Sequence, residues 1–414
     1  MSVDTVVVPP LRRDTRVHAW VAATGISQLG DVAWYIGLAW SAAQVAGPAG
    51  AGLVMGAGAI PRAVMLLVGG ALADRLDARR TMVVSNLARI AVLIVGLAAL
   101  ESTGLSLSLL FTIALVFGVV DAIYLPAAAT MPRQLVREED FTSVSALFQL
   151  SNRLAIFVGA PLGGFLVAHG GLRDVIIVDA VSFGVIAVAL ATVLRPRFPR
   201  QLSEGHSIWS DLRGGFGYLR RTPSVRTLVI ALSGLNLCVS PVLAVGLVFR
   251  TRDADWGATS LGLFEATSGV AAAIGAVIAL RWRSSDPARA GLLLLVVQAM
   301  ACVAIGIAPY AGVFLAMATI GLTAGLASAL LAGAFVAAVR ESYLGRCSSI
   351  VGLADQALMP AAMTGFGLLI SGVGVDVACA LVGTAFAAMM LWSIVRLAAI
   401  QPEPEAAEPV GRPG

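Results

Sequence analysis

Twelve long apolar segments follow one another along the chain, separated mostly by short polar stretches. A helix needs about 20 apolar residues to cross the hydrocarbon core of a bilayer. Backbone N–H and C=O groups cannot stay unpaired in lipid, so each segment is predicted to be a spanning helix. The predicted spans are 17–43, 49–73, 82–100, 105–128, 141–168, 174–194, 226–249, 258–280, 289–308, 311–339, 346–372 and 375–396. The sequence therefore predicts an all-α integral membrane protein.

The overall composition fits lipid better than water as the surrounding medium. Hydrophobic residues make up 58% of the 414 residues and charged residues 13%, whereas soluble domains carry roughly 25% charged residues. The net charge of +4 does not indicate nucleic-acid binding. The arginines lie at the ends of apolar segments and form no stripe with interleaved aromatic residues. The bilayer is therefore the expected partner.

The arginines alternate between loops in a way that predicts orientation. They gather in the N-terminal stretch, in every second loop and near the C-terminal end, whereas the opposite side holds only Arg173, Arg250 and Arg252. Cytoplasmic loops are enriched in basic residues. Both termini are therefore expected in the cytoplasm, in a bacterial plasma membrane, with an even number of spans.

A weak internal repeat predicts two related halves. The sequences that follow span four and span ten both place an arginine at a helix end, then a charged turn, then a small-residue helix with proline and glycine. Duplicated bundles of six helices recur among transporters. The expected parts are a tail at 1–16, a six-helix bundle at 17–194, a linker at 195–225, a second six-helix bundle at 226–396 and a tail at 397–414. Within the linker, 208–219 is amphipathic and predicts a surface helix.

The loop between spans two and three carries the most specific motif. It reads GGALADRLDARR from residue 69 to residue 80, and it resembles motif A of the major facilitator superfamily. The resemblance implies two pseudo-symmetric six-helix bundles and a cytoplasmic loop that stabilises one transport state. The residues that it assigns to this conformational role are Gly70, Asp74, Arg75, Arg79 and Arg80.

Span five carries a second motif, Gly159-Ala160-Pro161-Leu162-Gly163-Gly164. It resembles the antiporter motif of the same superfamily, with an alanine inserted before the proline. Gly159, Pro161, Gly163 and Gly164 would kink the helix and allow close packing against the other half. Most of the chain is similar to a bacterial exporter subgroup that includes macrolide-efflux and enterobactin-export proteins. This resemblance implies export of a small molecule in exchange for protons.

Charged residues inside predicted spans are the candidate coupling groups, because a charge in the membrane is costly without a partner, water or a function. Asp31 and Asp121 are the leading proton-coupling candidates, Arg153 is the expected counter-charge, and Glu265 is second in rank. The candidate cavity residues are Gln28, Tyr35, Tyr124, Gln149, Asn152 and Asn236. Arg62 and Arg89 are expected to have structural roles. A static ion pair between helices is the alternative for each acid.

The sequence indicates a secondary active transporter and not an enzyme. The three histidines lack metal-ligand spacing and no GxxxxGK[ST] motif is present, so no metal, cofactor or direct ATP use is expected. The favoured function is proton-coupled efflux of an amphipathic antibiotic, siderophore or secondary metabolite by a monomer. A nutrient importer on the same fold and a membrane sensor without transport are the alternatives.

Overall fold

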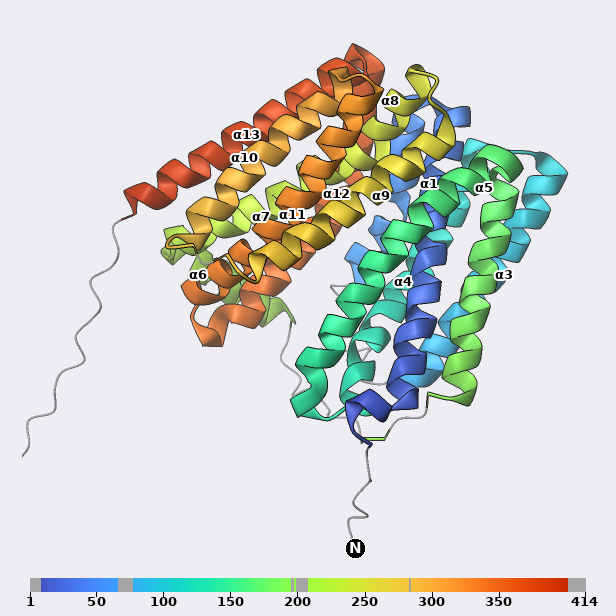
Figure 1. Ribbon diagram of the computed structural model, residues 1–414, viewed down its shortest axis with the longest axis horizontal. Coiled ribbons are helices and arrows are strands. Elements are labelled where there is room, and N and C mark those ends of the chain that lie inside the picture. Colours follow the sequence, from blue (N-terminus) through green and yellow to red (C-terminus); the bar gives the residue numbers. More distant parts are fainter. Residues whose placement is uncertain (1–8, 66–76, 195–196, 199–207, 283, 401–414) are drawn as a thin grey trace, which may run out of the picture.

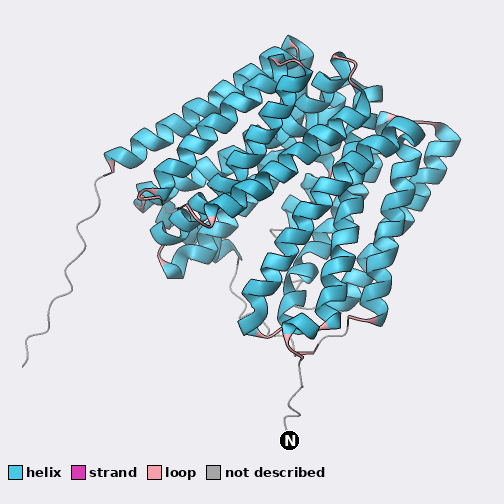
Figure 2. Ribbon diagram, viewed as in Figure 1, coloured by secondary structure: helices cyan, strands magenta, loops and turns pink. Residues whose placement is uncertain are grey.

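The computed structural model describes residues 9–65, 77–194, 197–198, 208–282 and 284–400, and in these ranges every regular element is helical (Figure 2). The helices of the first part are α1 (Thr15–Ala57), α3 (Ala78–Thr103), α4 (Leu107–Leu135) and α5 (Phe141–Thr192). They are followed by α6 (Ile208–Arg221), α7 (Pro223–Pro241), α8 (Leu247–Asp253), α9 (Gly257–Ala279), α10 (Pro287–Ile307), α11 (Tyr310–Ala338), α12 (Glu341–Val373) and α13 (Val375–Ala399). A π-helical turn, Val242–Gly246, joins α7 to α8.

Ten helices in the described ranges are long and apolar enough to cross a membrane, and two of them are long enough to cross it twice. The helix that contains α1 runs from Thr15 to Met65, and α5 has 52 residues. At a rise of 1.5 Å per residue, 52 residues extend about 78 Å, more than twice the hydrocarbon thickness of about 30 Å. Each of these two helices is interrupted by one glycine at positive φ, Gly47 at 62° and Gly171 at 66°. Glycine adopts this backbone conformation without a Cβ clash, so the chain reverses there and the described ranges accommodate the twelve predicted spans.

The spans form two bundles that lean together at one end (Figure 1). One bundle contains α1, α3, α4 and α5, and the other contains α7 to α13. Contact between the bundles runs mainly through α1 against α12 and α5 against α9. At the end where the described chain begins, the two bundles diverge (Figure 1). We call the end at which they meet the closed end.

Glycines bring the two bundles into backbone contact at the closed end. A methyl group on Gly262 of α9 would overlap the carbonyl oxygen of Ala160 in α5, and one on Gly164 would lie 2.5 Å from the carbonyl oxygen of Ala258. The contact of α1 with α12 is built in the same way, because a methyl group on Gly367 would overlap the Pro48 carbonyl oxygen. Small residues are what allow membrane helices to pack this closely.

The surface helix α6 coincides with the amphipathic stretch of the predicted linker and is anchored to the second bundle. The Tyr218 ring stacks on Tyr343 of α12 with 4.4 Å between ring centroids. The Tyr218 hydroxyl accepts a hydrogen bond from the Arg340 backbone N–H at 3.3 Å. Residues 195–196 and 199–207 of the linker lie outside the described residues.

A buried ion pair ties the start of α1 to the segment after α5. Arg197 donates to both carboxylate oxygens of Asp14, with Nη2 2.8 Å from Oδ1. The same carboxylate caps α1 by accepting from the backbone N–H of Arg16 at 3.1 Å and of Val17 at 3.4 Å. Burial of the Asp14 carboxyl opposes ionisation, but Arg197 and the two backbone donors outweigh it and hold the pKa of Asp14 below the ordinary 3.8.

Asp14→Ala is expected to lower the free energy of unfolding by about 3–5 kcal/mol, because it leaves the buried Arg197 guanidinium unpaired. Denaturation in mixed detergent micelles measures this loss. Glu101→Ala provides the matched control, since Glu101 and Arg173 form an exposed pair at 3.3 Å that should contribute about 0–1 kcal/mol. Because the pKa of Asp14 is lowered in the folded state, its stabilisation is complete above pH 3.8 and is lost as pH falls through the lower folded-state value. Equal losses for the two variants would contradict the prediction.

Candidate functional site

A cavity of about 530 Å³ lies inside the first bundle. Its walls come from α1, the helical segment that continues to Met65, α3, α4 and the start of α5. Aromatic side chains supply much of the surface: Trp20, Trp34, Tyr35, Phe117, Tyr124 and Phe148. Polar and charged groups from Thr24, Gln28, Asp31, Arg62, Arg89 and Asp121 face the same space. Three further lining residues lie near helix ends: Trp20 near the start of α1, Pro132 near the end of α4 and Phe148 near the start of α5.

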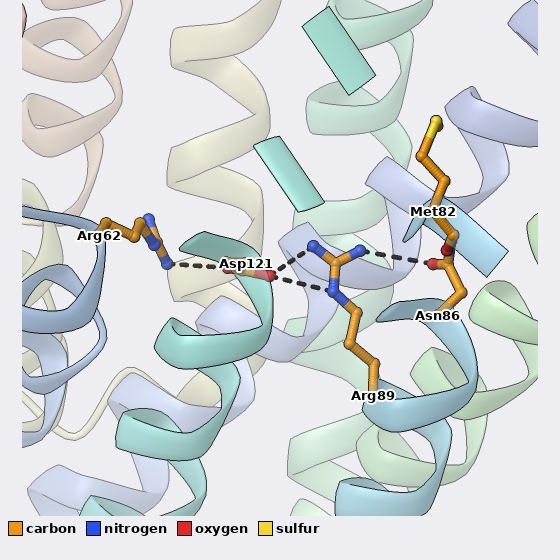
Figure 3. A network of polar contacts seen from close by, with 5 residues as sticks. All are labelled: Arg62, Met82, Asn86, Arg89 and Asp121. Atoms are coloured by element: carbon orange, nitrogen blue, oxygen red, sulfur yellow. Dashed lines mark hydrogen bonds and ion pairs between the residues drawn. The ribbon is translucent and has the colours of Figure 1, made fainter. Parts of the chain in front are cut away.

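Asp121 of α4 lies between two arginines at the wall of this cavity (Figure 3). Its Oδ2 is 3.1 Å from Nη2 of Arg62. Its Oδ1 accepts from Nε of Arg89 at 3.0 Å and also from Nη2 of the same guanidinium. Two positive charges thus share one carboxylate. The cluster retains one positive charge before Asp31 is counted.

Arg89 is fixed in place from several sides. Its side chain is only 5% exposed, and its Nη1 donates to Oδ1 of Asn86 at 3.4 Å. Asn86 is oriented in turn by donating from Nδ2 to the Met82 carbonyl oxygen at 2.8 Å (Figure 3). The guanidinium lies over the Tyr124 ring at 4.2 Å and the Phe183 ring at 4.9 Å, in cation–π geometry. Arg62 is the more exposed partner, with 35% of its side chain accessible to solvent.

Three polar atoms of the cavity residues lack a hydrogen-bond partner in the part of the chain that the structure describes. They are Oγ1 of Thr24, Oε1 of Gln28 and Nε of Arg62. Thr24, Gln28 and Asp31 lie at i, i+4 and i+7 and share one face of α1. Buried polar groups are normally hydrogen-bonded. This wall therefore has unused hydrogen-bonding capacity toward whatever occupies the cavity.

Four of the residues proposed from the first half line the cavity together with Asp31. Gln28, Tyr35, Tyr124 and Asp121 are all part of the wall. The residues proposed from span five do not take part: Gln149 is exposed and Asn152 half-buried, and neither lines the cavity.

The counter-charge of Asp121 differs from the expected one. Arg153 is half-buried on α5, outside the cavity wall. Arg62 and Arg89 occupy the positions beside the carboxylate, although structural roles elsewhere were expected for both. Helix rotation decides this outcome, because α5 turns Arg153 away while α3 turns Arg89 inward. The signal that pointed to Arg62 and Arg89 was their charge within an apolar span.

In the second bundle, the proposed polar residues lie apart from this cavity. Asn236 of α7 donates to Oδ2 of Asp355 in α12 at 2.7 Å, and Oδ1 of Asp355 is buried without a partner among the described residues. Glu265 of α9 interacts electrostatically with Tyr35 across the junction of the bundles. Glu265 is therefore outside the cavity wall but close enough to interact with one of its residues.

The loop between spans two and three is described only from Asp77 onward. Gly70, Asp74 and Arg75 of the predicted motif lie outside the described residues. Asp77 caps α3 by accepting from the Arg80 backbone N–H at 2.7 Å, and the Arg80 side chain is exposed. Arg79 donates from Nε to the Leu190 carbonyl oxygen at 2.7 Å and from Nη2 to that of Ala191 at 2.6 Å. A cation thus joins the last carbonyls of α5 to the start of α3.

The span-five motif lies where α1, α5 and α9 meet. Methyl groups on Gly159 and Gly163 would each lie 2.7 Å from the α1 backbone, at the Leu29 carbonyl oxygen and at Cα of Ala33. Gly164 faces α9 instead. Pro161 lies within the helix between these glycines. The motif therefore packs both within its own bundle and across to the other one.

Two bundles of long apolar helices in the described ranges, one of which holds an aromatic and charged cavity, are the architecture of a multi-pass membrane transporter. The chain belongs to the Major Facilitator Superfamily, whose family model matches residues 21–364.

Comparisons with individual proteins agree with this assignment. The enterobactin exporter EntS of Salmonella typhimurium (strain LT2) is 25% identical over 340 residues, which cover 74% of this chain and 78% of that protein. The uncharacterized MFS-type transporter YfiS of Bacillus subtilis (strain 168) is 27% identical over 227 residues, covering 53% of this chain and 52% of that protein. The crystal structure of the nucleoside transporter NupG superposes with a TM-score of 0.74 over 92% of this chain and 99% of that chain, at 12% identity. The structural likeness shows the shared fold.

Proposed function

We propose that the protein is a proton-coupled exporter that moves an amphipathic small molecule across the bacterial plasma membrane by alternating access. The observation that carries the proposal is the cavity, in which aromatic walls and ionisable groups face one space. The apolar part of a cargo would pack against Trp34 and Phe117, and its polar part would meet Gln28 and Arg62. Antibiotics, siderophores and secondary metabolites include molecules of this amphipathic kind.

The charges of the cavity support proton coupling through Asp31. Asp121 is already neutralised by Arg62 and Arg89. Asp31 lines the same cavity and makes no ion pair within the described ranges. A buried carboxylate that makes no ion pair is stabilised by binding a proton. Proton binding and release at Asp31 would change the cavity charge and thereby bias cargo binding.

The orientation expected from the arginine asymmetry is compatible with export. If both termini are cytoplasmic, the two bundles diverge on the cytoplasmic side in this conformation and the closed end faces outward. An exporter would load its cargo from the cytoplasm in this state. The similarity to a protein named as an enterobactin exporter supports the same direction.

Flux measurements in proteoliposomes test the proposed function. A panel of cationic, neutral and anionic amphipathic compounds is presented to purified protein, with a pH gradient imposed across the membrane. We expect at least one compound to move against its own gradient while protons move in the opposite direction. Movement of cargo and protons in the same direction would indicate an importer. Absence of flux for the whole panel, with correctly folded protein, would favour a sensor without transport.

Reporter fusions test the orientation independently. Because the basic loops are expected in the cytoplasm, tags at the N-terminus and the C-terminus should both report a cytoplasmic location in intact cells. A reporter in the short loop near Gly171 serves as the control and should report the outer side. An external signal from either terminus would contradict the proposed orientation.

A further inference from the structure

A second carboxyl group lies behind Asp31, at a place that the cavity does not reach. Asp179 is in the second half of α5 and is fully buried. A methyl group on Gly30 would lie 2.6 Å from Oδ1 of Asp179, so this carboxyl packs directly against the α1 backbone next to Asp31. The two carboxyls come from distant parts of the sequence, and only Asp31 lines the cavity.

Asp179 has few groups available to compensate a negative charge. Its Oδ2 is buried without a hydrogen-bond partner among the described residues. Its Oδ1 lies 3.2 Å from the Ser182 hydroxyl oxygen. The Ser182 hydroxyl also donates to the Asp179 backbone carbonyl at 2.8 Å. The Ser182 hydroxyl has one hydrogen, which it divides between the Asp179 backbone carbonyl and Oδ1. Ser182 therefore compensates a negative charge on Asp179 only in part.

The other charged groups around Asp179 do not compensate a negative charge on it either. The groups that interact with it electrostatically are Asp31 from α1, Arg89 from α3 and Asp121 from α4. Arg89 already donates twice to Asp121, and the two remaining groups are acids. Two neighbouring carboxylates in an apolar setting cannot both ionise without a large penalty.

We propose that Asp31 and Asp179 form one proton-binding site, in which the pair retains at least one proton in this conformation. Asp31 is the carboxyl that lines the cavity, and Asp179 is the buried carboxyl behind it. When Asp31 releases a proton to water, its O–H bond breaks and the negative charge is tolerated because Asp179 stays neutral. A role of this pair in transport rests on the proposed function. Binding of a proton by the pair does not depend on transport and can be measured without it.

Infrared spectroscopy of the full-length protein in lipid, with isotope-labelled aspartate, tests the pair without any cargo. Two carboxyls that interact strongly titrate as a pair. In Asp31→Asn, Asp179 should ionise at a pH about one unit lower than in the unsubstituted protein, because no negative charge can then form beside it. Asp179→Asn should leave the titration of Asp31 nearly unchanged, because asparagine stands in for the neutral Asp179 beside which Asp31 ionises. Asp355→Asn is the matched control, since Asp355 also has an unpartnered oxygen but lies in the other bundle, and it should shift neither.

Several results would overturn the proposal. The first is a titration of Asp179 that is the same in Asp31→Asn as in the unsubstituted protein. The second is a fully ionised Asp179 at neutral pH. Repeating the titration in sodium and in choline buffers adds a third, because displacement of the protonated band by sodium alone would indicate a metal-cation site. If Asp31→Asn does not fold, the titration of Asp179 in Asp31→Ser, which also removes the charge, decides the question. If proteoliposomes show proton-coupled flux but the two carboxyls titrate independently, the proposed pair is wrong and the proposed function is unaffected.

Discussion

Asp31→Asn is expected to abolish accumulation of cargo against its gradient while leaving cargo binding intact. Asparagine matches the protonated carboxyl in shape and hydrogen bonding but cannot release a proton. A pH gradient of one unit supports about tenfold accumulation for each exchanged proton. In proteoliposomes with such a gradient, the variant should fall to no accumulation, whereas exchange of cargo down its own gradient should continue. Simultaneous recording of cargo and proton flux measures both effects.

The informative control for Asp31→Asn is Asp31→Glu, which keeps the titratable group and should retain part of the coupling. If Asp31→Asn still pumps uphill with the unsubstituted protein's proton dependence, the coupling role passes to another acid, and Asp121 is next. If Asp31→Asn fails to insert or fold, Asp31 is better described as a structural group. The prediction thus separates a coupling role from a packing role.

Gly262→Leu is expected to separate the two bundles at the closed end. Even a methyl group there would overlap the Ala160 carbonyl oxygen, and this neighbour is backbone, which cannot rotate away. Overpacking of this kind costs about 1–3 kcal/mol, which corresponds to a population change of about 5–150-fold toward states in which α5 and α9 are apart. Transport should slow correspondingly, because the closed-end contact is one of the two states that the cycle requires.

Spin labels on the two bundles measure this shift. Ser102 at the end of α3 and Asp253 at the end of α8 are both exposed at the closed end. The distance between labels at these two positions should increase in Gly262→Leu. Gly333→Leu is the matched control, since a side chain at this helical glycine meets open space and should leave the distance unchanged. An unchanged distance in Gly262→Leu would show that the two bundles can still meet at the closed end with a larger side chain at residue 262.

The spans were predictable from the sequence because lipid imposes a strong and local rule. Any segment that crosses the bilayer must be apolar for about 20 residues and must be helical. The positions at which the chain reverses direction between spans were harder to predict. Between spans one and two, the polypeptide turns at Gly47 alone, so the loop expected there is almost absent. A single glycine at positive φ takes the place of a polar turn. A hydropathy profile does not detect such a turn, because it contains no polar segment.

The cavity was predictable only in part, because hydropathy fixes depth but not rotation about the helix axis. The spacing of Gln28, Asp31 and Tyr35 placed these residues on one face of one helix, and all three line the cavity. Pairing between helices depends on which face each helix turns inward. That is why Arg89 and not Arg153 meets Asp121. The approach of Asp179 to Gly30 had no sequence signal beyond the presence of an acid within a span.

The glycine contacts have a consequence for how such a protein diversifies. The surfaces that meet at the closed end are largely backbone, whereas the groups that would recognise cargo are side chains on the cavity wall. Substitutions that alter which compounds are accepted therefore need not disturb the contact between the bundles. Related proteins that descend from one ancestor could come to bind different compounds through a few substitutions in the cavity wall. The contacts between the bundles, and the conformational change that depends on them, would stay the same.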